Sequence, residues 1–184
     1  MDLVIRIEMK KVFLVMCMAL ICQNIFSQKH MNFMGIPIDG NINSFCKQLA
    51  ELGFIRDKEN APNNMYCFTG TFYGEDANVD VEYDPYTYVV HSVAINIIKK
   101  STLFLYPIQR DILKAIEEKY KFKKELVNPE LYQYDYYIFD DFDPIGLIQT
   151  FVIGSDTSQG AMLNITYRDV DNWLTMENRK NNDI

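Results

Sequence analysis

Hydrophobic residues recur along this chain at two spacings, and each spacing predicts a different element. Between Ile42 and Leu52 they return every three or four positions, which indicates an amphipathic helix over 42–52. Asn41 suits its N-cap, because the side-chain oxygen can accept a free N–H of the first turn. Gly53 suits the left-handed position that follows a helix.

A second helix is predicted over 107–120. Ile108, Ile112 and Ile116 recur there at intervals of four, with charged residues between them. Proline is tolerated at the first helical position because its missing N–H would have no partner there, so Pro107 sets the expected start.

Strict alternation of apolar and polar residues predicts strands, most regularly over 78–84 and 161–167. If the strand over 78–84 were shifted by one residue, Asp80 and Glu82 would be buried at a large cost in free energy. The alternation therefore predicts which residues point into the core and which point to solvent. Further strand candidates cover 66–73, 88–98, 136–139 and 147–153, and the tail around Trp173 is a helix candidate. We expect a dry face of Val79, Val81, Tyr83, Leu163, Ile165 and Tyr167, and a wet face of Asp80, Glu82, Asn164 and Thr166.

The predicted order is a helix and three strands, followed by a second helix and three strands. It favours an α+β fold with an antiparallel sheet and both helices on one face. The two halves fit an internal αβββ pseudo-repeat, and they equally fit two unrelated units with similar patterning.

The N-terminus has the pattern of a secretory signal. Two lysines precede an eleven-residue apolar run at 12–22, which is too short to span a bilayer. We expect cleavage near Ser27, with 1–8 as an upstream extension, and one domain over 28–184 in the periplasm or outside the cell. We expect no membrane span in that domain.

Charge narrows the choice of partner. The 184 residues carry a net charge of −7, and removal of 1–27 takes away three basic and two acidic residues, which leaves −8. Nucleic acid is bound through clustered cations, so we expect no nucleic-acid partner. An acidic exported domain is suited to a basic protein or a glycan.

Several short motifs resemble a group of uncharacterised secreted proteins common in Bacteroidales. They are FMGIPIDG at 33–40 after the signal peptide, LGF at 52–54, FTGTF at 68–72, EKY at 118–120 and YRD at 167–169. The chain departs from that group at Pro107 and in having no glycine after Tyr120. The resemblance implies an exported single small domain and no catalytic residue.

Most familiar chemistries lack the residues they need. The only histidines are His30 and His91, which excludes a histidine-rich zinc site, and no cofactor or metal site is expected. His30 lies close to the expected mature terminus and is expected to be mobile. His91 is in phase with apolar neighbours and is expected to pack in or beside a sheet.

Cys46 and Cys67 are the cysteines left after signal cleavage. In an oxidising compartment they fit a disulfide, and they also fit two separately buried thiols. In either case we expect neither to act as a nucleophile.

Carboxylates and tyrosines remain as candidate binding residues. Asp80 and Glu82 share a strand face, at a separation that paired glycosidase carboxylates also show. An acidic segment at 140–143 fits a turn between strands, and it also fits a cation site. The candidate site comprises Asp80, Glu82, Tyr134, Tyr136, Asp140, Asp141 and Asp143.

These observations predict a secreted, non-enzymatic domain that binds a protein through an acidic, tyrosine-bearing sheet face. Similar faces occur in small inhibitor-like and envelope-assembly domains built of αβ repeats, which is an analogy of fold. Two alternatives remain open: a small carboxylate-dependent hydrolase and a glycan-binding module. A deep pocket converging on two carboxylates would favour the hydrolase, and a row of exposed tyrosines would favour the glycan binder.

Overall fold

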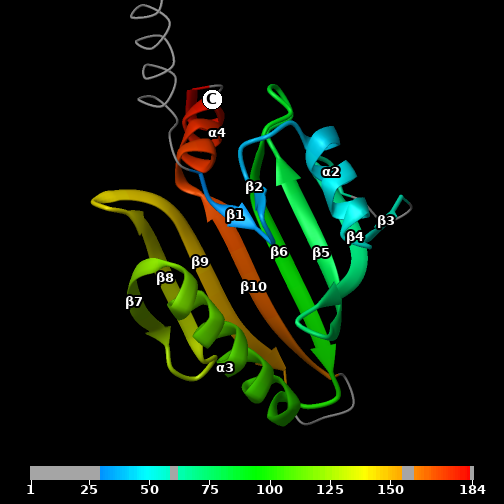
Figure 1. The fold of residues 1–184 in the computed structure, drawn as a ribbon, viewed down its shortest axis with the longest axis vertical. Coiled ribbons are helices and arrows are strands. Elements are labelled where there is room, and N and C mark those ends of the chain that lie inside the picture. Colours follow the sequence, from blue (N-terminus) through cyan, green and yellow to red (C-terminus); the bar gives the residue numbers. More distant parts are fainter. Residues whose placement is uncertain (1–29, 59–61, 155–159, 183–184) are drawn as a thin grey trace, which may run out of the picture.

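The computed structural model describes residues 30–58, 62–154 and 160–182, so the predicted signal peptide lies outside the described residues. An eight-stranded antiparallel sheet forms its centre, in the order β3-β4-β5-β6-β10-β9-β8-β7 (Figure 1). The predicted α+β fold is therefore confirmed. The strands of the sheet are β3 (Ile55–Asp57), β4 (Met65–Phe72), β5 (Glu75–Tyr83), β6 (Val90–Lys99), β7 (Lys121–Asn128), β8 (Gln133–Asp140), β9 (Asp143–Gly154) and β10 (Ala161–Asp169).

Within the described ranges, three helices and a small hairpin complete the fold. The helices are α2 (Ile42–Glu51), α3 (Thr102–Lys119) and α4 (Val170–Asn182), and the hairpin pairs β1 (Asn32–Phe33) with β2 (Ile36–Pro37). Figure 1 shows α2 and α3 on the same side of the sheet and α4 at one end of it. The tail around Trp173 is helical, as predicted.

The sheet is built from two similar halves. In the first, α2 is followed by β3 to β6, and in the second, α3 is followed by β7 to β10. The strand order is symmetric about the centre, where β6 pairs with β10, the fourth strand of each half. Each half is thus αββββ, and the predicted αβββ unit was one strand short. The missed strands, β3 and β7, are the two outermost strands, which lack a continuous dry face to reveal them.

Both predicted helices form, but the second begins earlier than expected. In α2, Asn41 accepts a hydrogen bond from the N–H of Asn43 at 2.9 Å, and Gly53 has a φ of +93°. Helix α3 begins five residues before Pro107, after an N-cap at Ser101 whose Oγ accepts from Leu103 N at 3.2 Å. The side chain of Leu103 is exposed, so water can reach the carbonyl that the proline leaves without a partner.

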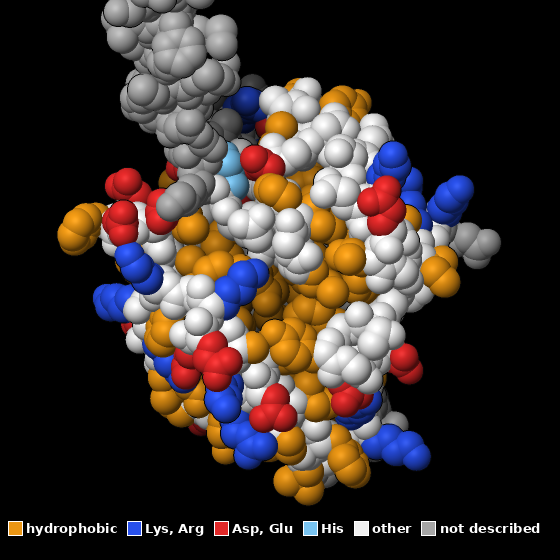
Figure 2. All heavy atoms as spheres, viewed as in Figure 1, with side chains coloured by type: hydrophobic (Ala, Val, Ile, Leu, Met, Phe, Trp, Pro, Cys, Tyr) orange, Lys and Arg blue, Asp and Glu red, His pale blue; other side chains and the backbone are white. Residues whose placement is uncertain are grey.

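The face of the sheet under α2 and α3, here called the covered face, has the predicted parity. Val79, Val81, Leu163 and Ile165 are fully buried, and Tyr167 is nearly so. Phe45 and Leu49 of α2 and Ile112 and Ile116 of α3 belong to the same core. On this side of the molecule hydrophobic side chains gather between the two helices, with charged ones around them (Figure 2).

The opposite face, here called the open face, carries the residues predicted to be wet, but they are not all exposed. Asp80 and Glu82 are half-buried, while Asn164 and Thr166 are only 8% and 9% exposed. The prediction was right about the face and wrong about exposure. Neighbouring polar side chains on the sheet cover one another. Among the described helices, none is long and apolar enough to cross a membrane.

Candidate functional site: the open face of the sheet

One line of paired residues crosses the open face over all eight strands. We call it the acidic row, because four of its eight members are carboxylates. The strand register places them side by side, and neighbouring strands lie about 4.8 Å apart. In strand order the acidic row is Asp57, Cys67, Asp80, Ala94, Thr166, Gln149, Asp135 and Glu125.

Hydrogen bonds between side chains link the centre of this face into a network. Asn96 donates to the Asp80 carboxylate at 3.0 Å, and Asn164 donates to Asn96 Oδ1 at 2.8 Å. Thr166 Oγ1 donates to Asn164 Oδ1 at 2.9 Å. The network fixes side-chain positions across β5, β6 and β10 before any partner arrives.

The second half of the face carries a matching group of polar side chains. Gln149 donates to Asp135 Oδ2 at 2.9 Å, and the Arg168 guanidinium donates to Gln149 Oε1. The other carboxylate oxygen, Asp135 Oδ1, is buried without a hydrogen-bond partner within the described part of the chain. A buried acceptor that lacks a donor carries a cost in folding free energy.

The open face has an excess of carboxylates over cations, and it also carries exposed apolar side chains. The acidic row and the rows on either side of it hold five carboxylates and two cations, with Glu82 the fifth carboxylate and Arg168 and Lys123 the cations. Beyond them, Ile98 and Ile153 are 59% and 42% exposed. A polar centre beside exposed apolar side chains is suited to a protein partner.

A pocket of about 300 Å³ lies at one end of the open face, against α4. We call it the α4 pocket. Glu82 and Arg168 of the open face line it, together with Trp173 and Met176 from α4 and with His91. His91 is 5% exposed, so it packs against the sheet as predicted, and burial lowers its pKa to about 4.

Tyr134 and Tyr136 do not lie with Asp80 and Glu82, so the predicted tyrosine-bearing acidic face is wrong in this respect. Both rings are on the covered face, where the Lys124 ammonium is 4.6 Å and 5.2 Å from their centroids. The Tyr136 hydroxyl donates to Glu117 at 2.9 Å. Tyr134 lines a separate pocket of about 480 Å³, here called the tyrosine pocket, beside α3.

The acidic segment forms the tight turn between β8 and β9. Asp140 pairs with Asp143, and Asp141 at the tip has a φ of +52°. Lys121 Nζ lies 2.7 Å from the Asp141 carboxylate. This segment is therefore a hairpin turn, and its carboxylates do not belong to the acidic row.

The two cysteines are unbonded and lie on opposite faces of the sheet, and both are half-buried rather than buried. Cys46 packs from α2 against the core of the covered face, whereas Cys67 belongs to the acidic row. Burial raises the pKa of each thiol to about 11, and at Cys67 the neighbouring Asp80 raises it further. Both thiols are therefore protonated, and so unreactive, near neutral pH.

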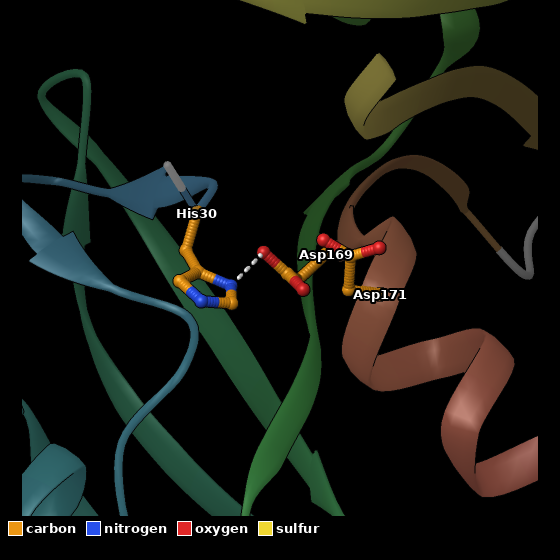
Figure 3. Close-up of side chains that lie close together, drawn as sticks. All are labelled: His30, Asp169 and Asp171. Carbon is orange, nitrogen blue, oxygen red and sulfur yellow. Dashed lines mark hydrogen bonds and ion pairs between the residues drawn. The ribbon is translucent and has the colours of Figure 1, made fainter. Parts of the chain in front are cut away.

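A cluster at the start of α4 joins the two ends of the described chain (Figure 3). His30 Nδ1 lies 2.9 Å from Asp169 Oδ2. The prediction that His30 is mobile is therefore wrong, because this contact holds its side chain in place. The same oxygen accepts from Met31 N at 3.0 Å, and Oδ1 accepts from Asn172 N at 3.0 Å. Ligand atoms of His30, Asp169 and Asp171 lie within 4.8 Å of one another, but both Asp169 oxygens already accept hydrogen bonds. Asp169 therefore caps the N-terminus of α4 and also holds the segment at His30 and Met31 against it, an arrangement here called the clamp.

Local sequence patterns point to neither the α4 pocket nor the clamp. The His30–Asp169 contact joins residues 139 positions apart, and the pocket needs α4 to fold against β6, β9 and β10. Comparison of the chain with family models, with curated proteins and with solved structures gave no match.

Proposed function

We propose that this chain is an exported, non-enzymatic binding protein that presents the open face of its sheet to a basic protein. The observation that supports this most is the acidic row, in which four carboxylates lie on one line across the sheet. Hydrogen bonds already hold Asp80 and Asp135 in place. A preorganised surface loses less side-chain entropy when a partner binds.

The hydrolase alternative needs two carboxylates in one pocket, and the pair Asp80 and Glu82 does not have this arrangement. Glu82 lines the α4 pocket, whereas Asp80 does not. The other carboxylates of that pocket, Asp84 and Glu177, are paired with Arg179 and Lys180. Asp80 accepts a hydrogen bond from Asn96 and faces Cys67. We therefore favour binding over hydrolysis.

The tyrosine pocket favours glycan binding as a second candidate function. Tyr106, Tyr132 and Tyr134 line it, and the Tyr106 and Tyr132 rings are 4.5 Å apart. Aromatic rings beside cations suit the apolar faces and polar rims of sugars. Saturation-transfer NMR with neutral and acidic oligosaccharides tests this, and loss of the signal in Tyr132→Ala would assign it to the pocket.

A hexa-arginine peptide tests the proposed function. We expect Asp80→Asn/Glu82→Gln to weaken its binding about tenfold at 50 mM salt and to flatten the salt dependence, because two of the five carboxylates are neutralised. Fluorescence anisotropy of a labelled peptide measures both effects. The melting temperature should change little, since both side chains are half-buried and amides preserve their shape.

The matched control is Glu51→Gln/Asp111→Asn, which makes the same change in net charge on exposed positions of α2 and α3. We expect it to reduce binding less than twofold. Equal losses in the two double variants would mean that the peptide responds to net charge alone, and the open face would then not be the site.

A further inference from the structure

The α4 pocket is continuous with the open face. Glu82 and Arg168 belong to the row next to the acidic row, on either side of Ser92, and both line the pocket. A segment of protein bound along the acidic row could therefore place one side chain in the pocket. Its volume of about 300 Å³ is at the small end of ligand sites, as one side chain requires.

Most charges around this pocket are already paired. Asp84 accepts from the Arg179 guanidinium, and Lys180 Nζ lies 3.2 Å from the Glu177 carboxylate. Arg168 is engaged with Gln149 and lies 5.9 Å from the centroid of the Trp173 ring.

Glu82 is the exception among the described charged residues that line the pocket. It takes part in no ion pair or side-chain hydrogen bond with the described part of the chain. A half-buried carboxylate without a partner gains most from a cation that is brought into the pocket.

The walls suit an aliphatic stem that ends in such a cation. Met65, Tyr83, Trp173 and Met176 supply apolar surface. His91 also lines the pocket, and its Nδ1 is buried without a hydrogen-bond partner. Burial lowers the pKa of His91 to about 4, so the ring is uncharged at neutral pH and does not repel a cation. Lysine and arginine bury their stems against apolar surface while the charged head meets an acceptor.

We infer that the α4 pocket is an anchor site for a lysine or arginine side chain of the basic partner, with Glu82 as the carboxylate that receives the cation and Trp173 and Met176 as the wall against its stem. This inference rests on the proposed function, because the open face brings the partner to the pocket. The pocket would add a specific side-chain contact to the general electrostatic attraction between the acidic row and the basic partner.

The chain contains a single tryptophan, so its fluorescence reports on this pocket alone. We expect Nα-acetyl-arginine amide to change the Trp173 emission saturably, with a dissociation constant in the millimolar range. Its uncharged analogue, Nα-acetyl-citrulline amide, should give no saturable change. Glu82→Gln should weaken binding of the arginine amide about tenfold, the effect of losing one charged hydrogen bond. Glu51→Gln, at an exposed position of α2 away from the pocket, should leave it unchanged.

Three results would overturn the inference: no saturable response to the arginine amide, an equal response to the citrulline amide, or saturation by acetate in its place. Acetate binding would mean that the pocket accepts an anion through Arg168. These results are distinguishable from failure of the proposed function. Hexa-arginine binding that depends on Asp80 but leaves the Trp173 emission unchanged would refute the anchor and retain the open face. A Trp173 response together with peptide binding indifferent to the acidic row would refute the face.

Discussion

The two faces of the sheet are made by the same strands and have opposite characters. In β5, Val79 is fully buried on the covered face while the next residue, Asp80, belongs to the acidic row. In β6, Ile95 is fully buried while Asn96 bonds to Asp80 and Asn164. Because side chains alternate along a strand, one sequence can encode a core and a recognition surface without compromise between them. Stability should depend mainly on the covered face, and binding on the open one.

The largest effect is expected from adjacent substitutions in β6. Ile95→Ala removes buried apolar volume from the core and should reduce the free energy of unfolding by about 3 kcal/mol. Asn96→Ala breaks two hydrogen bonds on the open face and should cost about 2 kcal/mol, at about 1 kcal/mol for each bond. Urea unfolding of both variants measures the difference. Equal losses would mean that the polar network is as important for stability as the core.

His91 lies between Val90 and Ser92, at the point in β6 where the regular alternation between the two faces is interrupted. Glu82 pairs with Ser92 and Tyr83 with Val90, so His91 is the extra residue of a β-bulge. Burial lowers its pKa to about 4; Lys180 and Arg168 act in the same direction, and Asp84 and Glu177 oppose them.

The sign of the resulting pH dependence follows from proton binding. The unfolded chain takes up a proton at His91 near pH 6.5, while the folded chain does so only near pH 4, so stability should fall as the pH falls through this window. Between pH 7 and pH 4.5 the loss from this group should be about 2 kcal/mol. His91→Gln should remove that part of the pH dependence of urea unfolding. An unchanged pH dependence in this variant would contradict the assignment.

An effect of similar size is expected at Asp169, a buried carboxylate on the covered side of β10. Asp169→Ala removes the cap of α4 and the hydrogen bonds to His30 and Met31, and should cost about 2 kcal/mol. Asp169→Asn should cost less than half as much, because asparagine also caps helices. Thermal unfolding measures both variants. If asparagine is as damaging as alanine, the negative charge matters more than the cap.

Several features of the fold could be predicted from the sequence because their causes are local. Asn41 and Gly53 mark the ends of α2 because capping depends on residues within one turn. The alternation of Val79, Asp80 and Val81 placed them on the correct faces because the side-chain period of a strand is two. The face of Tyr134 was missed because its strand has tyrosines on both faces, so alternation does not identify which one is buried.

What only the tertiary structure decided is which distant residues meet. The acidic row exists because eight strands align in one register, and no single strand contributes more than one of its members. The α4 pocket exists because the last helix folds back against β6, β9 and β10, which brings Trp173 to the same pocket as Glu82 and His91. The sequence by itself determined the helices, the face parity and the α+β class. The site depended on long-range pairing, because loop closure and register bring together residues that no local pattern relates.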